Sequence, residues 1–375
     1  MQTGATVHRY EALDGLRGVA ALSVMVGHFG LLLDLFEMPN GFLAVDTFFV
    51  MSGFVIAYSY GERLNRGMSA WSYLYRRIVR LYPMFVIALL IGAVVLYYGA
   101  HRGALEYRTT DLLRSLALNA LYIPFLNSVP VYFEVGQIFP ADPPAWSLFF
   151  EMLASGAFLL LFAARLKTLV LMCALFYIAL IATGVHYASN GAWIDIHNGY
   201  YTSNLLGGLP RVGFGFCLGV LLHAVIRAGI VRWPIQRMAE AIPYPSFLIY
   251  GILLAIFVFP KSAHGLYGLV ALATVVPAIV FFGAHVRLRS ELEKNVASFL
   301  GWISYPIYCL HYPIIRLAIF LRGGRHVSSY SLMAISAAVT LALAVVLTRW
   351  YEEPLRAALS GRLFAPPRSQ ISKAN

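Results

Sequence analysis

The sequence predicts an all-α polytopic membrane protein with about ten transmembrane helices. Hydrophobic residues make up 60% of the 375 residues, whereas charged residues make up only 12%. A soluble domain usually carries about 25% charged residues, so this chain has too little polar surface to be one. Uncharged runs of about 18 or more residues, long enough for a helix to cross a bilayer, also recur along it. This composition argues against a nucleic-acid-binding, disordered or disulfide-rich secreted protein.

The charged and Pro/Gly-rich breaks divide the chain into successive helices. The predicted spans are roughly residues 15–33, 41–60, 84–99, 145–164, 168–187, 205–226, 244–260, 265–285, 302–321 and 330–349. Segment 112–125 is apolar but short, which indicates a re-entrant or interfacial piece. Residues 1–360 are therefore expected to form one transmembrane domain and residues 361–375 a short polar cytoplasmic tail. We expect no large extracytoplasmic domain after the last span.

The distribution of basic residues predicts the orientation of these spans. If the N-terminus is inside, most of the 28 Lys and Arg residues fall in inner segments. Cytoplasmic loops of membrane proteins carry such an excess, so both termini are predicted to be cytoplasmic. The asymmetry accounts for most of the net charge of +11 through attraction to anionic lipids of the bilayer, and it requires no nucleic-acid partner.

Four ionisable residues are predicted to reach one depth in the outer half of the bilayer. They are His28, Asp46, Glu151 and Arg211, each on a different span. Ionisable groups at membrane depth are costly and usually functional. A desolvated imidazole favours its neutral form, and a neighbouring carboxylate can fix its tautomer, so the group indicates a general base. Alternatively, the two carboxylates could be structural partners of Arg211, and His28 could be an interhelical hydrogen bonder.

A basic cluster lies in an inner segment, at WSYLYRRIVRLYP over 71–83. Arg76 and Arg80 are four residues apart and would share one helix face. Guanidinium groups bind phosphate through paired hydrogen bonds, although the cluster is equally compatible with an ordinary membrane anchor. A phosphorylated donor at these arginines, with a base half a membrane away, would suit acyl-coenzyme A. Its phosphates would stay on the cytoplasmic side while its thioester arm threads inward.

Seven motifs occur in an order that is typical of one family. They are YEALDGLRGVAALSVMVGHF at 10–29, GFLAVDTFFVMSGFVIA at 41–57, RRIVRLYP at 76–83, WSLFFE at 146–151, RVGFGFCLG at 211–219, LGWISYPIYCLHYP at 300–313 and YEEPLR at 351–356. With this set, the chain resembles the membrane-bound acyltransferase-3 family, bacterial enzymes that O-acylate glycans and small molecules. The resemblance covers nearly the whole chain.

The resemblance implies a role for each candidate site residue. His28 would be the catalytic base, Arg17 would lie near the path of the donor, and Glu151 would be a functional carboxylate near the acceptor, with Asp46 as a further catalytic candidate. The expected coenzyme-binding residues are Arg76, Arg77, Arg80, Ser52 and Gly53. The expected acceptor-binding residues are Arg211, Tyr308, His311 and Trp146. For His311, a structural hydrogen bond is an equally good interpretation.

The implied function is transfer of an acyl group, by default acetyl, from cytoplasmic acetyl-CoA. The acceptor would be a hydroxyl of a glycan, glycolipid or small molecule at the outer side of a bacterial inner membrane. No metal is expected, and the oligomeric state is left open. The alternative is a proton-coupled transporter of a small solute, since buried charges are common in carriers. For that alternative, Gly207, Gly208 and Pro210 would mark a broken helix. A non-catalytic membrane anchor is a third interpretation.

Overall fold

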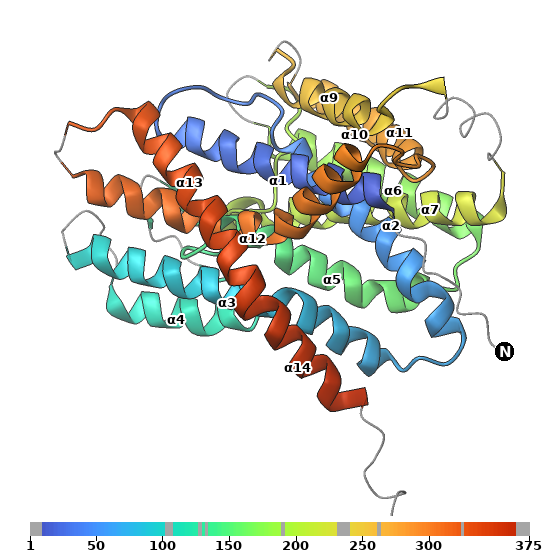
Figure 1. Cartoon of the computed structure of the whole chain (residues 1–375), viewed down its shortest axis with the longest axis horizontal. Coiled ribbons are helices and arrows are strands. Elements are labelled where there is room, and N and C mark those ends of the chain that lie inside the picture. The colour runs from blue at the N-terminus through green and yellow to red at the C-terminus, as the bar shows by residue number, and fades with distance from the viewer. Residues whose placement is uncertain are drawn as a thin grey trace, which may run out of the picture.

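The computed structural model describes residues 10–101, 108–126, 130–131, 134–188, 192–230, 241–260, 264–323 and 326–364 (Figure 1). Within these ranges, nine helical segments are long and apolar enough to cross a membrane, and a tenth apolar helix has 14 residues. The predicted all-α polytopic fold is therefore confirmed. Most of the predicted tail lies outside the described residues.

The helices follow one another with short connections. The first half contains α1 (Glu11–Leu32), α2 (Leu43–Asn65), α3 (Ala70–His101), α4 (Thr109–Ala120), the strands β1 (Pro130–Val131) and β2 (Glu134–Val135), the 3-10 helix η1 (Pro143–Ala145), α5 (Trp146–Leu161) and α6 (Leu166–His186). The two strands pair in an antiparallel manner. The second half contains the 3-10 helix η2 (Thr202–Gly207), α7 (Gly208–Ala228), α9 (Pro245–Val258), α10 (His264–Ala273), α11 (Val275–Gly283), α12 (Glu291–Arg322), α13 (Ser329–Leu347), the π-helical turn η3 (Thr348–Glu352) and α14 (Glu353–Phe364).

Three predicted spans differ from the observed helices. The span predicted over 302–321 begins eleven residues earlier, at Glu291, as the 32-residue helix α12. The predicted span 265–285 is broken at Thr274 into α10 and α11. Pro277 explains the restart, because a proline is tolerated in the first turn of a helix but disrupts its interior. The predicted span 84–99 belongs to the 32-residue helix α3, which also contains the whole basic cluster. The guanidinium groups of that cluster therefore sit on the same rigid element as a membrane span.

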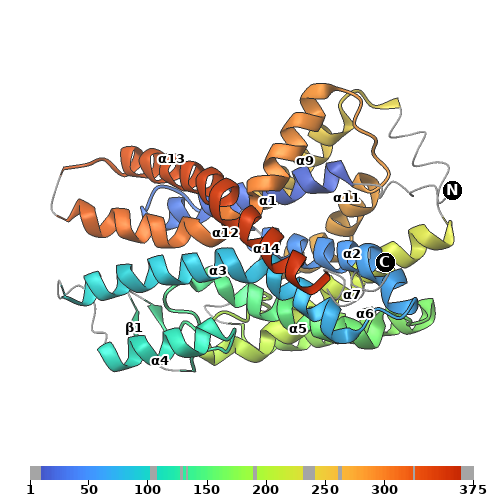
Figure 2. The same cartoon turned by 60° about the horizontal axis from the view of Figure 1, so that its bottom comes forward.

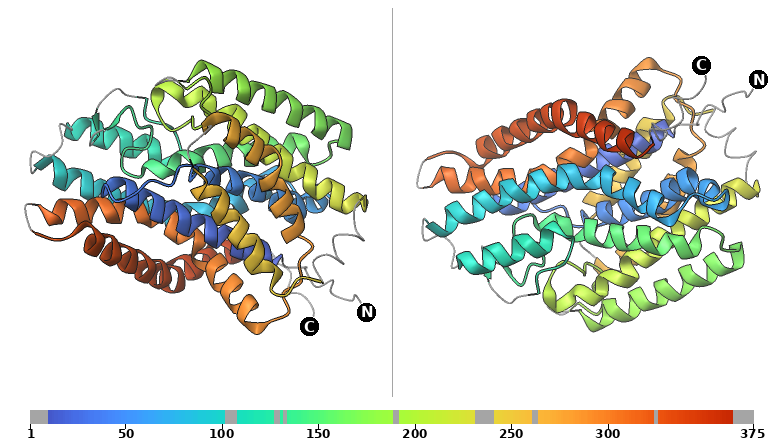
Figure 3. Two further views of the ribbon diagram at one scale, coloured as in Figure 1. Left: turned by 90° about the horizontal axis from the view of Figure 1, so that it is seen from above. Right: turned by 90° about the horizontal axis from the view of Figure 1, so that it is seen from below.

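Close helix packing organises the bundle around α1 and α2. Helix α1 packs along α12, and α2 packs along α7. Figure 3 shows α1 running through the middle of the bundle, with α12 and α13 on one side and α5 and α6 on the other. Helix α13 covers the outer side of α12 (Figure 2). At the α2–α7 contact, a Cβ atom on Gly53 or Gly219 would collide with the backbone of the facing helix. Small residues allow such approach in membranes, where packing replaces the hydrophobic effect.

The start of α1 and the helix α14 lie at the same end of the bundle. Gly18 of α1 approaches the backbone of Leu300 in α12. Trp302, two residues further along α12, donates a hydrogen bond of 2.9 Å from Nε1 to Glu353 of α14. The predicted topology has an even number of membrane crossings, which would place the start of α1 and helix α14 on the same side of the membrane. The assignment of this end to the cytoplasm stays a prediction.

Candidate active site

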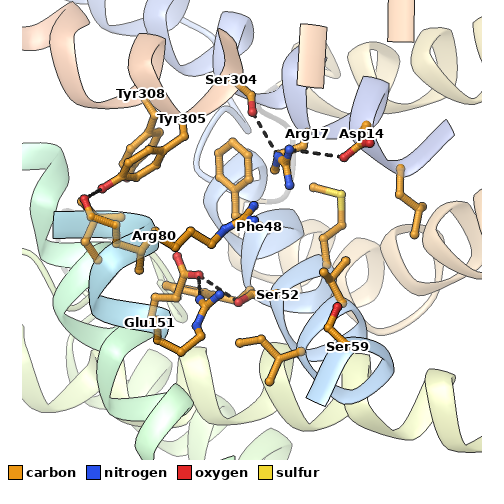
Figure 4. Close-up of a pocket in the computed structure, with 18 of the residues that line it drawn as sticks. Asp14, Arg17, Phe48, Ser52, Ser59, Arg80, Glu151, Ser304, Tyr305 and Tyr308 are labelled. Carbon is orange, nitrogen blue, oxygen red and sulfur yellow. Dashed lines mark hydrogen bonds and ion pairs between the residues drawn. The ribbon is translucent and has the colours of Figure 1, made fainter. Parts of the chain in front are cut away.

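A large cavity opens between α1, α2, α3, α5 and α12, and we call it the arginine cavity (Figure 4). Its volume is about 600 Å³. The charged side chains that line it are Arg17, Arg77, Arg80, Asp14 and Glu151. Three cations against two carboxylates give the cavity an excess of positive charge, which favours an anionic ligand.

Arg17 is fixed to the wall of the arginine cavity by hydrogen bonds to α12 and to its own helix. Its Nε donates to Ser304 Oγ at 3.0 Å, and its Nη2 donates to the carbonyl oxygen of Gly301 at 3.0 Å. A weaker ion pair joins Nη2 to Asp14 at 3.3 Å. These contacts hold the guanidinium in place without a ligand.

Glu151 connects three helices inside the arginine cavity. Its Oε1 accepts a hydrogen bond of 2.6 Å from Arg77 Nη2 and one of 3.0 Å from Ser52 Oγ. Arg77 also donates from Nε to Ser155 Oγ at 3.2 Å. Glu151 was expected near the acceptor and at the depth of Arg211, and the structure corrects this by placing it among the coenzyme-binding candidates. The carboxylate of Glu151 is paired with Arg77 of α3 rather than with the imidazole of His28.

Arg80 differs from the other two arginines of the cavity. Among the described residues it has no hydrogen bond or ion pair, and its half-buried side chain extends into the cavity between Glu151 and Arg17 (Figure 4). Arg76, predicted to act together with Arg80, does not line the cavity. Arg77 and Arg80 both line the cavity, although Arg76 lies about one helical turn before Arg80. Arg80 is therefore the cation most available to a ligand.

A second, smaller pocket lies further along α1, and we call it the histidine pocket. Its volume is about 280 Å³, and its lining includes His28, Trp146, His197 and Tyr308. Arg17 and His28 are eleven residues apart on one helix, which separates them by about 16 Å along its axis at 1.5 Å per residue. A single helix therefore presents a cation to one cavity and an imidazole to the other.

His28 pairs with a second histidine. Its Nδ1 lies 2.9 Å from Nε2 of His311 in α12, and Nδ1 of His311 lies 3.0 Å from the carbonyl oxygen of Ile307. The edge of the His28 ring also meets Tyr312, with ring centroids 5.3 Å apart. A carboxylate was expected to orient His28. The structure corrects this, because the described side chain hydrogen-bonded to His28 is the imidazole of His311.

Asp46 and Arg211 form a buried ion pair behind the wall of the histidine pocket, where the Arg211 guanidinium lies 5.0 Å from the ring of Trp146. Arg211 donates from Nε to Asp46 Oδ1 at 2.7 Å and from Nη2 to Oδ2 at 3.1 Å. Two carbonyl oxygens, of Asn198 and Phe42, accept its remaining hydrogen bonds at 3.1 Å each. Neither side chain lines a cavity, and both are almost fully buried. This geometry favours the structural interpretation that the sequence left open, since four hydrogen bonds from Arg211 join α7 to α2, to Phe42 and to the loop before η2.

Tyr308 is the wall between the arginine cavity and the histidine pocket, because its side chain lines both. Its hydroxyl donates to the carbonyl oxygen of Pro144 at 2.9 Å and lies 2.7 Å from Ser147 Oγ. Pro144 lines the histidine pocket and Ser147 lines the arginine cavity. The ring of Phe48 meets Tyr308 edge-on, with centroids 5.5 Å apart. The phenol ring of Tyr308 is therefore common to the linings of both spaces.

Gly53 and Ser52 were both expected to line a thioester channel, and they separate in the structure. Ser52 lines the arginine cavity, whereas Gly53 faces the backbone of α7 at Phe216. The small residue at 53 thus serves helix packing rather than ligand approach. In the described ranges, no group of three or more His, Cys, Asp or Glu side chains is arranged to hold a metal ion.

Several site residues were not singled out from the sequence. Asp14 could have been found, because an acid three residues before Arg17 on one helix is a typical ion-pair spacing. Ser147 lies inside the WSLFFE motif and could have been singled out there, whereas His197 lies in a loop outside every quoted motif. Tyr10 also lines the arginine cavity, and burial raises the pKa of its phenol, so it stays an uncharged hydrogen-bond donor.

Comparisons with known proteins point to one chemistry. A family model described as an acyltransferase domain matches residues 10–349. "Protein 2 in picA locus" of Rhizobium radiobacter is 34% identical over 163 residues, which are 40% of this chain and 81% of that protein. No solved structure matches the chain.

Two longer relatives carry functional names. "Putative peptidoglycan O-acetyltransferase" of Bacillus subtilis (strain 168) is 26% identical over 340 residues, which cover 83% of this chain and 49% of that protein. "Putative O-acetyltransferase" of Staphylococcus aureus (strain COL) is 25% identical over 372 residues, which cover 92% of this chain and 57% of that protein. The chain thus spans about half the length of these two relatives.

Proposed function

Because the chain belongs to the acyltransferase-3 family, we propose that it transfers an acyl group from acyl-CoA in the arginine cavity to a hydroxyl group in the histidine pocket. O-acyl transfer is the chemistry supported by the family and by relatives named as O-acetyltransferases. The donor, the base, the acceptor and the membrane are our proposals. Membership in this family favours acyl transfer over solute transport and over a purely structural role.

One observation carries the proposal: the two cavities share Tyr308 as a common wall. A donor and an acceptor can enter separate spaces, one cationic and one with an imidazole, and meet at a single point. Holding two reactants in this way converts a bimolecular reaction into an effectively unimolecular one, which lowers its barrier by several kcal/mol. A site for one ligand would not need two spaces of opposite character.

The arginine cavity has the features that acetyl-CoA requires. Arg80 supplies a guanidinium with free donors for the phosphate groups, and guanidinium–phosphate hydrogen bonds are strong because both partners are charged. Further into the cavity, Phe48, Met51 and Ser52 provide a mostly apolar lining suited to the acyl-carrying arm. The donor would therefore lie with its phosphates at the arginines and its thioester towards Tyr308.

His28 is the proposed general base. Its Nε2 takes the proton from the acceptor hydroxyl, whose oxygen attacks the thioester carbonyl carbon. The carbon–sulfur bond then breaks, and the thiolate of coenzyme A receives the proton from His28. The products are an O-acyl ester and free coenzyme A, so the enzyme returns to its starting state. This direct transfer needs one imidazole and no acyl-enzyme.

The acceptor is proposed to be a glycan or glycolipid hydroxyl, presented from the outer face of a bacterial inner membrane. Trp146, Phe42 and Tyr308 give the lining of the histidine pocket an aromatic character that suits a sugar, since aromatic rings provide apolar surface. Acetyl is the proposed acyl group, because the relatives are named as O-acetyltransferases, one of them for peptidoglycan.

Replacement of His28 by Ala tests the proposal. We expect His28→Ala to lower acetyl transfer by about 10²-fold to 10⁴-fold, the usual contribution of a general base. Membrane vesicles would be incubated with radioactive acetyl-CoA and a glycan acceptor, and label in the glycan would be counted. His186→Ala is the matched control, because His186 is an exposed histidine in α6 away from both cavities. Full transfer by His28→Ala would remove His28 from the reaction.

A further inference from the structure

The contact between His28 and His311 determines where the protons of the two rings lie. A carbonyl oxygen can only accept a hydrogen bond, so the 3.0 Å contact between His311 Nδ1 and the carbonyl of Ile307 places a proton on that Nδ1. The 2.9 Å contact between His311 Nε2 and His28 Nδ1 holds one further proton. When the pair is uncharged, those two protons are all it has.

Only one neutral distribution satisfies both contacts. His311 already carries its proton on Nδ1, so its Nε2 must be bare and must accept. The shared proton therefore belongs to His28 Nδ1, and His28 Nε2 is the nitrogen with a free lone pair. His28 lines the histidine pocket, and no described side chain other than His311 is hydrogen-bonded to it.

We propose that His311 is a positioning residue that fixes His28 in the tautomer with a bare Nε2. This role rests on the proposed function of His28 as base and extends it. The chain of hydrogen bonds runs from the carbonyl oxygen of Ile307 through the rings of His311 and His28 to the histidine pocket. The backbone carbonyl thus sets the proton-accepting atom from two rings away.

The surroundings of His311 support a fixed geometry. His311 is fully buried, and it lies on α12, the helix that packs along the whole of α1. Gly18, the residue after Arg17, brings the two backbones close together at Leu300. His311 thus lies on the helix that packs most extensively against the helix of His28. A side chain in a loop would not hold a ring nitrogen at hydrogen-bond distance as reliably.

The arrangement also spreads the positive charge that forms during catalysis. When His28 accepts a proton at Nε2, it becomes an imidazolium that donates from Nδ1 to His311. The neutral ring stabilises this cation by a charge-assisted hydrogen bond. In acyl-transfer enzymes with a buried carboxylate at this position, loss of the correct tautomer costs about 10⁴-fold in kcat. An imidazole acceptor performs the same orientation without burying a second charge.

Two variants of similar size separate positioning from packing. His311→Gln keeps an acceptor oxygen near the place of Nε2, whereas His311→Leu has none. We expect His311→Leu to lower kcat for acetyl transfer by about 10²-fold to 10⁴-fold, with the KM for acetyl-CoA unchanged because the arginine cavity is intact. His311→Gln should recover at least about a tenth of the wild-type kcat. Unaltered kcat in His311→Leu, or equal losses in two variants that both elute as folded protein, would overturn the proposal.

A spectroscopic test needs no substrate and therefore does not depend on the proposed function. In protein labelled with ¹⁵N at histidine, the signals lost in His28→Ala identify the ring nitrogens of His28. We expect its Nε2 to resonate as an unprotonated nitrogen and its Nδ1 as a protonated one, with a mixture of tautomers in His311→Leu. The reverse assignment in the wild type would overturn the proposal. Absence of acetyl transfer by the wild type would instead refute the proposed function and leave the tautomer result standing.

Discussion

At the scale of single residues, three arginines in one cavity have different tasks. Arg17 and Arg77 are bound to the protein, by Ser304 and Glu151 respectively, and serve as fixed positive walls. Arg80 has no such partner among the described residues and reaches into the space (Figure 4). A ligand that binds Arg80 therefore breaks no existing ion pair, whereas binding to the other two would compete with their present contacts.

Replacement of Arg80 by Gln should weaken donor binding. We expect the KM for acetyl-CoA to rise about tenfold or more, because a hydrogen bond to a charged group contributes about 1.5–3 kcal/mol, while kcat changes little. Initial rates over a range of acetyl-CoA concentrations measure both constants. Arg66→Gln is the matched control, since Arg66 is an exposed arginine outside the cavity. A KM equal to that of the wild type would make Arg80 a membrane anchor.

Asp142, just before the membrane-spanning helix α5, makes stability depend on pH. Burial raises the pKa of its carboxyl well above the usual range, against the opposing attraction of Arg316, and neither oxygen has a hydrogen-bond partner among the described residues. A raised pKa means that the folded state holds this carboxyl protonated. Its contribution to stability is therefore fully present below the unfolded pKa of about 3.9 and is lost as pH rises towards the folded pKa.

The neutral substitution Asp142→Asn should remove this pH dependence. We expect the apparent melting temperature in detergent to exceed that of the wild type near about pH 8, and the difference to shrink towards about pH 5. Thermal unfolding followed by intrinsic fluorescence at several pH values measures it. A difference that stays constant with pH would show that Asp142 is ionised in the folded protein.

The sequence predicted the kinds of site residue better than their partners. His28, Arg17, Arg80 and Ser52 could be singled out from helix depth and motif spacing, and all four line one of the two cavities. The pairings of Glu151 with Arg77, and of His28 with His311, were not predicted. Depth along a helix gives one coordinate, whereas the direction of a side chain around the helix axis depends on which neighbour packs there.

At the scale of elements, α2 and α7 depend on glycine at their contact. A Cβ at Gly53 would meet the carbonyl oxygen of Phe216, and a Cβ at Gly219 would meet that of Val50. Since helices in a membrane associate through packing rather than through the hydrophobic effect, lost contact is not compensated elsewhere. The pair also carries Ser52 and the Asp46–Arg211 ion pair, so its spacing affects both the cavity wall and the buried charges.

Introduction of a single methyl group at this contact should destabilise the protein. We expect Gly53→Ala to lower stability by about 1–3 kcal/mol, the usual cost of overpacking, seen as a lower apparent melting temperature. Gly156→Ala is the matched control, because a Cβ at Gly156 in α5 meets no neighbouring atom. Equal melting temperatures in the two variants would mean that the helices separate without cost.

Most spans could be predicted from the sequence, and the exceptions have a common cause. Uninterrupted apolar runs gave α1, α2, α5, α6 and α7 within a few residues. The span predicted over 244–260 corresponds to the 14-residue helix α9. The break at Thr274 was not predicted, because hydropathy shows that a segment is apolar and does not show where its helix is interrupted. The segment around Gly208 and Pro210, considered as a broken helix, is the junction at which the 3-10 helix η2 passes into α7.

At the scale of the whole molecule, the two cavities and the wall between them form one path. The ring of Tyr308 closes this path. Its hydroxyl is hydrogen-bonded to the carbonyl oxygen of Pro144 and lies close to Ser147 Oγ. With acetyl-CoA bound in the arginine cavity as proposed, the closed wall would separate its thioester from water in the histidine pocket and slow its hydrolysis. The acceptor would then have to displace Tyr308 before the two reactants meet.

Removal of the wall should uncouple donor cleavage from transfer. We expect Tyr308→Ala to hydrolyse acetyl-CoA without acceptor several-fold faster than the wild type, while Tyr308→Phe, which keeps the ring, changes hydrolysis less. Release of free thiol in the absence of glycan measures this. Tyr330→Ala is the control, because Tyr330 is an exposed tyrosine of α13. Hydrolysis at the wild-type rate in Tyr308→Ala would indicate that another group shields the thioester.

The separation of Arg17 and His28 by eleven positions has a consequence for the cell that reaches beyond the reaction. In the proposed orientation, the thioester bond of acetyl-CoA is formed inside the cell, and its cleavage drives acetylation outside the cell. No nucleotide triphosphates are available there. Coenzyme A would stay inside the cell throughout, so the cell would not have to take it up again. The extent of acetylation at the cell surface would then follow the intracellular concentration of acetyl-CoA, and would therefore depend on the nutrition of the cell.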